Sequence, residues 1–192
     1  RLMDICATSD GGAALVVSSL EFARKIGRAD AVKVAAVSTV TPTYASSVIE
    51  MPDIATDSAA VVAAHSFRAA LPVKAYEEAG IGPADVDVAE VYDLSTALEL
   101  DWMEDLQLCE RGQAAQLVRA GDTRVGGRLP INPSGGLACF GEAVPAQAIA
   151  QVCELTWQLR GDAGARQVAG ARVGITANQG LFGHGSSVIL KR

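Results

Sequence analysis

Three polar or glycine-rich loops, residues 92–95, 132–142 and 178–185, follow predicted helices or strands and could carry chemistry. None of them contains GxGxxG, a phosphate-binding P-loop or GxSxG, so nucleotide binding through such loops and an esterase-type serine are not indicated. The two histidines, His65 and His184, lie far apart, and no serine or cysteine joins either of them with an acid. His65 falls in a helix rich in Ala and Val, where a lone histidine is more often structural than catalytic.

The four cysteines offer no disulfide or metal pattern. They are widely spaced, form no CxxC pair, and each lies among apolar residues: Cys6, Cys109, Cys139 and Cys153. This usage indicates reduced thiols in a cytoplasmic protein, and it predicts no metal site.

Composition excludes several further classes of protein. The 192 residues (19.8 kDa) are 49% hydrophobic and 20% charged, which supports a substantial core and excludes disorder and a coiled coil. The net charge of −6 argues against a nucleic-acid partner, and no apolar run reaches the roughly 18 residues of a membrane span. The chain starts at Arg1 without a signal peptide, and we expect it to be a fragment of a longer protein.

Alternating strand and helix patterns predict an α/β fold with one main sheet. Residues 41–57, which hold Tyr44 and Asp53, are expected to form a long and functional loop. Helices are expected over residues 8–26, 59–80, 95–109, 111–120 and 143–160, and strands over 32–40, 85–92, 172–177 and 186–191.

Several segments resemble the thiolase superfamily in the correct order along the chain. Residues 4–14 (DICATSDGGAA) resemble its SDGAAA stretch, and residues 75–88 (AYEEAGIGPADVDV) resemble the helix, turn and strand that precede its NEAF or HDCF loop. That loop corresponds to residues 88–95 (VAEVYDLS). Residues 132–136 (NPSGG), followed by Gly141, are similar to the NPSGG…GHP block, and residues 178–183 (NQGLFG) to the C-terminal glycine-rich turn.

The resemblance is strongest to the sterol-carrier-protein type of thiolase, also called lipid-transfer proteins. It implies the C-terminal half of a thiolase fold, a βαβαβαββ repeat, preceded by the end of the N-terminal repeat. We place the end of the N-terminal repeat and a loop region at residues 1–60, and the C-terminal repeat at residues 61–192. The nucleophilic cysteine of the family would lie in the absent N-terminal half.

The departures from the family bear directly on the chemistry. Glu142 stands where thiolases carry the histidine of GHP, and Tyr92 replaces the Asn or His of the NEAF or HDCF loop. Residues 171–192 contain no cysteine, although thiolases use one there as acid and base. Claisen cleavage needs an activated thiolate and a proton shuttle, so standard thiolase chemistry is not expected from these residues.

Family members with such losses resemble the aldolases of steroid side-chain breakdown, which cleave a β-hydroxyacyl-CoA to a ketone and a shorter acyl-CoA. A retro-aldol step needs a base for the β-hydroxyl proton, donors for the enolate oxygen and an acid for the α-carbon. The resemblance implies a partner with a small OB fold of the DUF35 type, and a homodimer core within a heterotetramer. No cofactor is expected, because the substrate itself carries coenzyme A.

Tyr92 is the first catalytic candidate, because it occupies a known active-site position of the family. Tyr44 is the second, and Glu142 is the third, as a base or as the group that orients a tyrosine or a water. A tyrosine is a poor base at neutral pH unless its phenolate is stabilised or it passes the proton on in concert. The residues expected to bind the CoA thioester are Gly180, Gly183, Asn178 and Ser134, the two glycines through backbone N–H groups.

Each candidate also has a structural interpretation. Tyr92 could be a core residue with a satisfied hydroxyl, Tyr44 a packing or subunit contact, and Glu142 a solvated residue at a helix start. The remaining residues of these loops also have structural interpretations. Asn132 and Ser134 could hold the shape of the loop, Cys139 could fill apolar space, and His184 could cap the last turn.

Two other functions are compatible with the same sequence. One is a thiolase-like acyl-CoA acyltransferase or condensing enzyme whose missing half supplies a cysteine. The other is a non-catalytic thiolase-fold subunit that binds acyl-CoA or scaffolds a partner. An acylated cysteine would indicate the first, and tight partner binding without turnover the second.

Overall fold

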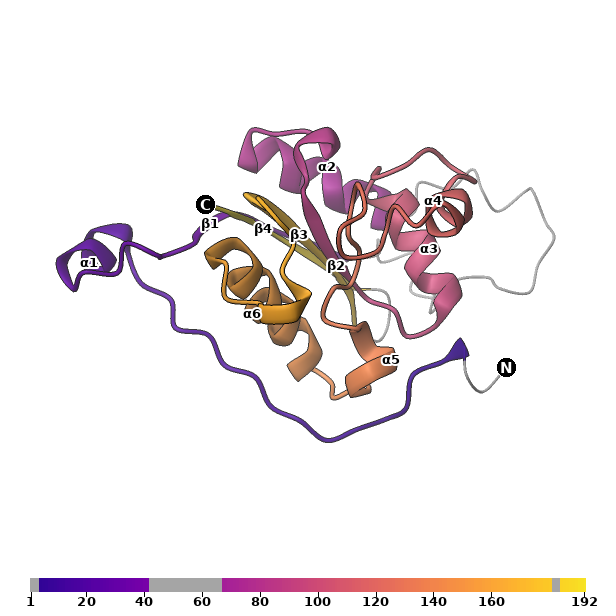
Figure 1. Ribbon diagram of the computed structural model, residues 1–192, viewed down its shortest axis with the longest axis horizontal. Helices are drawn as coiled ribbons and strands as arrows, with labels where there is room; N and C mark the ends of the chain where they lie inside the picture. The colour runs from indigo at the N-terminus through magenta and orange to yellow at the C-terminus, as the bar shows by residue number, and fades with distance from the viewer. Residues whose placement is uncertain (1–3, 42–66, 181–183) are drawn as a thin grey trace.

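The computed structural model describes residues 4–41, 67–180 and 184–192 of the chain. Within these residues, four strands form one mixed sheet, and helices cover both of its faces (Figure 1). The strands are β1 (Lys33–Val40), β2 (Val88–Val91), β3 (Val173–Gln179) and β4 (Gly185–Lys191). The helices are α1 (Leu20–Lys25), α2 (Phe67–Ala79), α3 (Thr96–Asp105), α4 (Ala114–Ala120), α5 (Gly136–Phe140) and α6 (Ala146–Arg160), with 3-10 turns η4 (Pro83–Asp85) and η5 (Gly164–Arg166).

The strand order is β1-β4-β3-β2. Strand β2 runs parallel to β3, whereas β4 runs antiparallel to both of its neighbours, β3 and β1. On the outer side of β2, Ile131 forms an isolated parallel bridge with Ala89, so the chain returns to the sheet there for a single residue. With this bridge as its third strand, the described chain follows the predicted βαβαβαββ order, and the predicted α/β class is confirmed.

The two faces of the sheet are covered differently. Helix α2 packs on β1 and β4, and α3 reaches the end of β2, where buried side chains such as Leu71, Trp102 and Met103 form the larger core. Helix α6 packs on the opposite face, with Leu155 and Leu159 fully buried against β2, β3 and β4 (Figure 1). The same helix also buries four polar residues, which are Gln147, Gln151, Glu154 and Gln158.

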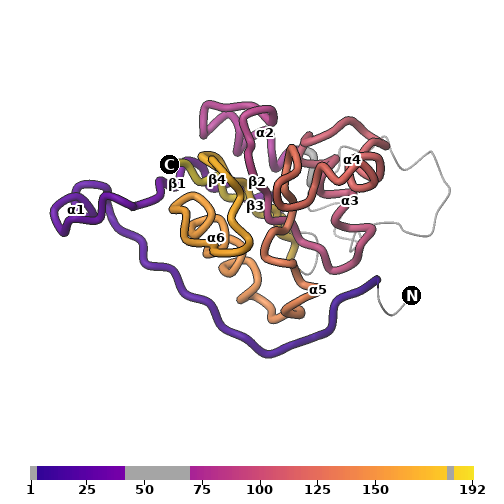
Figure 2. The backbone as a smooth tube through the Cα atoms, viewed as in Figure 1, coloured from indigo at the N-terminus to yellow at the C-terminus, as the bar shows by residue number. Residues whose placement is uncertain are grey.

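The N-terminal segment differs from the expected helix over residues 8–26. Only Leu20–Lys25 is helical, and the chain before it is an extended strap that passes α5 and α6 on its way to α1 (Figure 2). The apolar side chains predicted to form one helix face have nothing to pack on, since Val16 is fully exposed and Leu15 is 42% exposed. An isolated helix of this length is marginal without packing, so the backbone instead bonds to distant loops.

The other predicted helices, as far as they are described, and the strands predicted over residues 32–40 and 85–92 are confirmed with shorter bounds, whereas β3 and β4 extend past the predicted ranges 172–177 and 186–191. The helices expected over residues 95–109, 111–120 and 143–160 begin and end within those ranges, as α3, α4 and α6. Residues 42–66 and 181–183, and with them Tyr44, His65, Gly183 and the expected boundary at residue 60, lie outside the described residues. Among the described helices, none is long and apolar enough to cross a membrane.

Removing a core side chain from α2 should destabilise the protein far more than trimming its surface. Leu71 is 0% exposed within the larger core, so Leu71→Ala should lower the free energy of unfolding by about 2–5 kcal/mol. The matched control is Lys74→Ala, at an exposed position of the same helix, with an expected change of about 0.5 kcal/mol or less. Urea denaturation measures both, and similar losses in the two variants would contradict the described packing.

Candidate functional site

Strand β2 delivers two polar side chains to the end of the sheet. All four residues of β2 are buried, and Tyr92 and Asp93 follow directly, with 7% and 8% of their surfaces exposed. Parallel strands of α/β sheets commonly present functional groups at their carboxyl ends. The residues after β2 therefore occupy the position where the sequence predicted a site.

The backbone of β2 is bonded to the segment that leads into the 132–142 loop. The Ala89 N–H donates to the Pro130 carbonyl at 3.1 Å, and the Asn132 N–H donates to the Ala89 carbonyl at 2.8 Å. The Asn132 side chain adds a further bond, because its Oδ1 accepts the Val91 N–H at 2.7 Å. Asn132 adopts a left-handed conformation (φ 48°), in which its side chain can satisfy the backbone of the neighbouring strand.

A buried carboxyl group continues this connection. Glu90 is 1% exposed, and its two oxygens accept the Ser134 N–H at 3.1 Å and the Ser134 hydroxyl at 2.7 Å. Burial raises the pKa of Glu90 to about 8, partly opposed by the two bonds from Ser134. The predicted binding residue Ser134 is thus bonded to the interior of the protein, in agreement with its alternative role in shaping the loop.

Asp93 holds the start of α5. Its Oδ1 accepts the Leu137 N–H at 2.9 Å, which satisfies one of the open amides of the first helical turn. Helix α5 lies so close that a Cβ on Gly136 would come within 2.7 Å of the Asp93 Cγ, and Gly136 also has a positive φ of 62°. Only glycine is compatible with this approach.

Glu142 meets Tyr92 at the other end of α5. The Tyr92 hydroxyl donates a short hydrogen bond to Glu142 Oε1, so the structure brings two of the three predicted catalytic residues into contact. The backbone of Glu142 is held by the N-terminal strap, because its N–H donates to the Ala7 carbonyl at 2.8 Å and its carbonyl accepts the Ser9 N–H at 3.0 Å. Gly141 makes this contact possible, since a Cβ there would lie 2.9 Å from the Ala7 carbonyl oxygen.

The electrostatics of the site favour protonated groups. Burial, together with the hydrogen bond to Glu142, raises the pKa of Tyr92 far above its ordinary value, so its phenol is neutral at physiological pH. Burial also raises the pKa of Asp93, and it raises the pKa of Glu99 to about 7, with the charge of Asp93 adding to the effect. In this neutral state the Tyr92 hydroxyl acts as a hydrogen-bond donor, and its acceptor is Glu142.

The Cys6 thiol lies close enough to Glu142 for the charge of that carboxylate to affect it. The strap places Cys6 beside the loop after β2, where its N–H donates to the Leu94 carbonyl at 2.9 Å. Burial and the neighbouring carboxylates of Glu142 and Asp93 raise the pKa of the Cys6 thiol. A thiol in such surroundings stays protonated and is a weak nucleophile.

The predicted binding residues at the last turn are engaged with the protein. The Asn178 Nδ2 donates to Gln151 Oε1 at 3.1 Å, and Asn178 is 6% exposed. The Gly180 N–H donates to the His184 carbonyl at 2.7 Å, so this amide is not available to an oxyanion in this arrangement. His184 is exposed and takes part in this turn through its backbone.

Sequence reasoning assigned no role to Asp93 and did not consider Glu90 or Glu99. Glu90 carried a usable signal, because an acidic residue stood within the apolar run Val88–Val91 of a predicted buried strand. A buried carboxyl needs hydrogen-bond partners, and the nearby NPSGG loop could have been proposed to supply them. Asp93 carried a weaker signal, as a capping residue follows many strands that precede helices.

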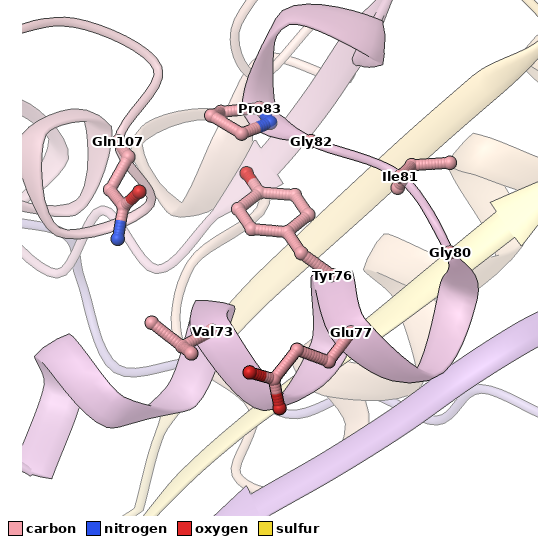
Figure 3. A pocket seen from close by; sticks show the side chains of 8 residues that line it. All are labelled: Val73, Tyr76, Glu77, Gly80, Ile81, Gly82, Pro83 and Gln107. Carbon is pink, nitrogen blue, oxygen red and sulfur yellow. The ribbon is translucent and has the colours of Figure 1, made fainter.

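A hollow of about 380 Å³ lies away from the Tyr92–Glu142 pair, at the end of α2 (Figure 3). It is open and mostly apolar, and the hydroxyl of Tyr76 on its wall donates inward to the Leu106 carbonyl at 2.7 Å. None of the predicted site residues lines it, so we place the candidate site at the pair. The hollow is lined by Val73, Tyr76, Glu77, Gly80, Ile81, Gly82, Pro83 and Gln107.

Comparisons with known proteins agree with the predicted family. Residues 41–192 match the family model described as thiolase C-terminal domain-like. Sterol carrier protein 2 of Rattus norvegicus is 42% identical over 184 residues, which cover 95% of this chain and 32% of that protein. The acetyl-CoA acetyltransferase of Methanothermobacter thermautotrophicus is 37% identical over 197 residues, which cover 98% of this chain and 46% of that protein.

A solved structure supports the fold. The Ltp2-ChsH2(DUF35) aldolase superimposes with a TM-score of 0.66 and 22% identity, covering 83% of this chain and 39% of that one. At this identity the match establishes the fold alone, and it confirms the predicted thiolase fold. The chain spans between about a third and a half of the length of these relatives.

The buried carboxyl of Glu90 should make stability depend on pH. Its pKa of about 8 lies above the ordinary value of 4.5, so the fold favours the neutral form, and this contribution to stability is lost as pH rises from about 4.5 to 8. Glu90→Gln cannot ionise. The variant should therefore gain stability relative to the wild type across this range, by up to about 1.4 kcal/mol per pH unit.

Urea denaturation at pH 5, 6.5 and 8 measures this difference. The matched control is Glu21→Gln on the exposed helix α1, which should keep the pH dependence of the wild type. If the free energies of unfolding of Glu90→Gln and wild type differ by the same amount at all three pH values, Glu90 ionises as readily in the folded protein as in the unfolded chain.

Proposed function

Since the chain belongs to the thiolase family through its C-terminal domain-like region, we propose that it serves the retro-aldol cleavage of a β-hydroxyacyl-CoA to a ketone and a shorter acyl-CoA. The observation that carries this proposal is the hydrogen bond from the Tyr92 phenol to the Glu142 carboxylate. The pair occupies family positions at which thiolases hold groups that work with a cysteine. A phenol and a carboxylate supply proton transfer and need no covalent intermediate.

The first half of the reaction is a proton relay. Glu142 takes the phenolic proton while the Tyr92 oxygen takes the proton of the substrate β-hydroxyl, so the phenolate is never an isolated charge. The oxygen electrons form the ketone C=O, the Cα–Cβ bond breaks, and its electron pair moves into the thioester as an enolate. A concerted transfer fits the raised pKa of Tyr92, which disfavours free phenolate.

The second half returns the proton. The α-carbon of the enolate takes a proton from the Tyr92 hydroxyl, which recovers its own from Glu142, and both residues regain their starting state. The net result is the transfer of the β-hydroxyl proton to the α-carbon, and no outside reactant is consumed. Tyr44 stays a candidate for this second transfer, since it lies outside the described residues.

The thiol chemistry of the described chain is compatible with this proposal. Cys6, Cys109 and Cys153 all have thiol pKa values raised by burial, which opposes the thiolate that a covalent route requires. Cys6 is the one of the three that lies beside the pair. Its neutral thiol adds no negative charge where the enolate would form.

The substrate and partners are also part of the proposal. We assign a steroid side-chain thioester, because the relatives include proteins named sterol carrier protein 2 and the structural neighbour is named an aldolase. The name of that neighbour includes ChsH2(DUF35), which supports an OB-fold partner of the DUF35 type. A homodimer core within a heterotetramer stays a prediction. Contacts of CoA with Asn178, Ser134, Gly180 and Gly183 stay predictions.

Acyl transfer is the second candidate, favoured by the relative named acetyl-CoA acetyltransferase, of which the chain covers 46%. It would require a reactive cysteine outside this chain, as in the thiolases that the sequence resembles. The two candidates differ in one measurable feature, which is the covalent acyl-enzyme that only acyl transfer forms.

Removing either member of the pair should abolish most retro-aldol activity. Tyr92→Phe and Glu142→Gln, each made in the complete protein, should lower kcat for release of ketone and acyl-CoA by about 10²-fold or more, because each breaks the relay. Coupled assays of both products measure the loss.

The matched control is Tyr76→Phe, which removes another buried tyrosine hydroxyl, bonded to the Leu106 carbonyl and away from the pair. It should cost about 1 kcal/mol of stability and leave kcat unchanged. Wild-type kcat in both Tyr92→Phe and Glu142→Gln would refute the relay.

Mass spectrometry of the complete protein should distinguish the two reactions. After mixing with a steroid side-chain β-hydroxyacyl-CoA or with acetyl-CoA, we expect product formation from the first and no acylated cysteine from either. A cysteine that becomes acylated at the rate of turnover would instead establish acyl transfer. Tight binding of an OB-fold partner without turnover of either thioester would establish a non-catalytic subunit.

A further inference from the structure

We propose that Glu90 is a positioning residue for the Tyr92–Glu142 pair and acts through Ser134, which it holds by both the amide and the hydroxyl. This inference rests on the proposed function for its kinetic consequence, whereas its structural consequence can be measured without turnover. Glu90 is too deeply buried to touch a substrate, so its effect must pass through the residues that it contacts.

The contacts form a continuous path to Glu142. Ser134 donates to Glu90 at 3.1 and 2.7 Å, and the Ser134 hydroxyl oxygen in turn accepts the Gly136 N–H at 3.1 Å, at the first residue of α5. Helix α5 is only five residues long, and the Gly141 N–H donates to the Leu137 carbonyl at its end, directly before Glu142. Such a short helix has little stability of its own and takes its position from its ends.

Asp93 holds the same helix from a second point. It accepts the Leu137 N–H, whereas Glu90 bonds to the turn before it, so one carboxyl group within β2 and one just after it fix the start of α5. Both positions flank Tyr92 on the chain. The strand that carries the phenol thus also carries the groups that place its carboxylate partner.

A serine at position 134 needs such an acceptor. Without Glu90, the Ser134 amide and hydroxyl would lose the carboxyl oxygens that accept their hydrogen bonds and would have to find water or shift. A shift of the turn moves α5, and a displacement of about 1 Å at reacting groups can cost about 10²-fold in rate.

Glu90 lies among charged groups, so its ionisation would change the electrostatics around the pair. It faces Glu154 from α6, the guanidinium of Arg166 from η5, which is bonded to Glu154 at 2.8 Å, and Asp93 at the end of its own strand. Ionisation near pH 8 would place a new negative charge behind the site where an enolate forms. We therefore expect kcat of the wild type to fall above about pH 8.

Hydrogen exchange of the complete protein tests the structural step. In Glu90→Ala, the protection of the Ser134, Gly136 and Leu137 amides should fall about tenfold or more, while that of β3 and β4 stays as in the wild type. Glu90→Gln keeps an acceptor for the amide and a donor for the hydroxyl oxygen, and it should restore the protection. An equal loss across β3 and β4, or no loss at the three amides, would overturn the proposal.

Kinetics test the functional step. Glu90→Ala should lower kcat by about 10- to 100-fold at an unchanged KM, and Ser134→Ala should lower kcat to a similar extent, with kcat of the double variant within about twofold of the worse single one. Glu90→Gln should retain kcat at pH 7 and lose the decline above pH 8. Full kcat in Glu90→Ala, or a decline above pH 8 that persists in Glu90→Gln, would contradict a positioning role.

The two proposals fail in different ways. If the wild-type protein cleaves no β-hydroxyacyl-CoA, the proposed function is wrong, but the local change in exchange still decides whether Glu90 positions α5. If Glu90→Ala does not fold, the comparison of Glu90→Gln with wild type above pH 8 still decides whether Glu90 acts on the pair.

Discussion

The hydrogen bonds that join β2 to residues 130–142 determine where every group of the candidate site lies. Five consecutive residues of the strand and its exit, 89–93, each bond to the returning segment, through the backbone at Ala89 and Val91 and through side chains at the other three positions. The side chains of Glu90, Tyr92 and Asp93 reach different parts of that segment, which are Ser134, Glu142 and the Leu137 amide. The hydrogen bonds between β2 and residues 130–142 therefore hold the turn at Ser134, helix α5 and the Glu142 carboxylate at separate points.

This arrangement concentrates carboxyl groups in a poorly hydrated region. Glu90, Asp93 and Glu99 all have raised pKa values, chiefly because burial penalises their charged forms. Such a cluster weakens the fold at high pH, and proteins commonly accept this cost at sites that move protons. The neutral phenol of Tyr92 fits the same environment, since it adds no further negative charge to the region.

The sequence predicted the order of elements well because strands and most helices are encoded by local patterns. The β-branched run over residues 32–40 became β1, although only Ala36, Ser38 and Val40 are buried there, and the loop pair that carries Tyr92 and Glu142 was identified from family motifs. The helix over residues 8–26 formed only at Leu20–Lys25, because most of its apolar side chains stay exposed in the described chain. The roles of Glu90 and Asp93 were missed since they depend on partners more than forty residues away, which spacing alone cannot identify.

The two backbone bonds between the N-terminal strap and Glu142 make the site a product of long-range assembly. Residues 7 and 9 bracket a residue that lies more than 130 positions later in the chain, whereas the four strands close without them. The strap is held by few hydrogen bonds and most of its side chains are exposed, so it can open locally while the sheet stays closed. The sheet can thus be complete while the Glu142 carboxylate is still out of position. A protein with its full secondary structure then need not have an assembled site, because the site also requires the docking of a few residues at the opposite end of the chain.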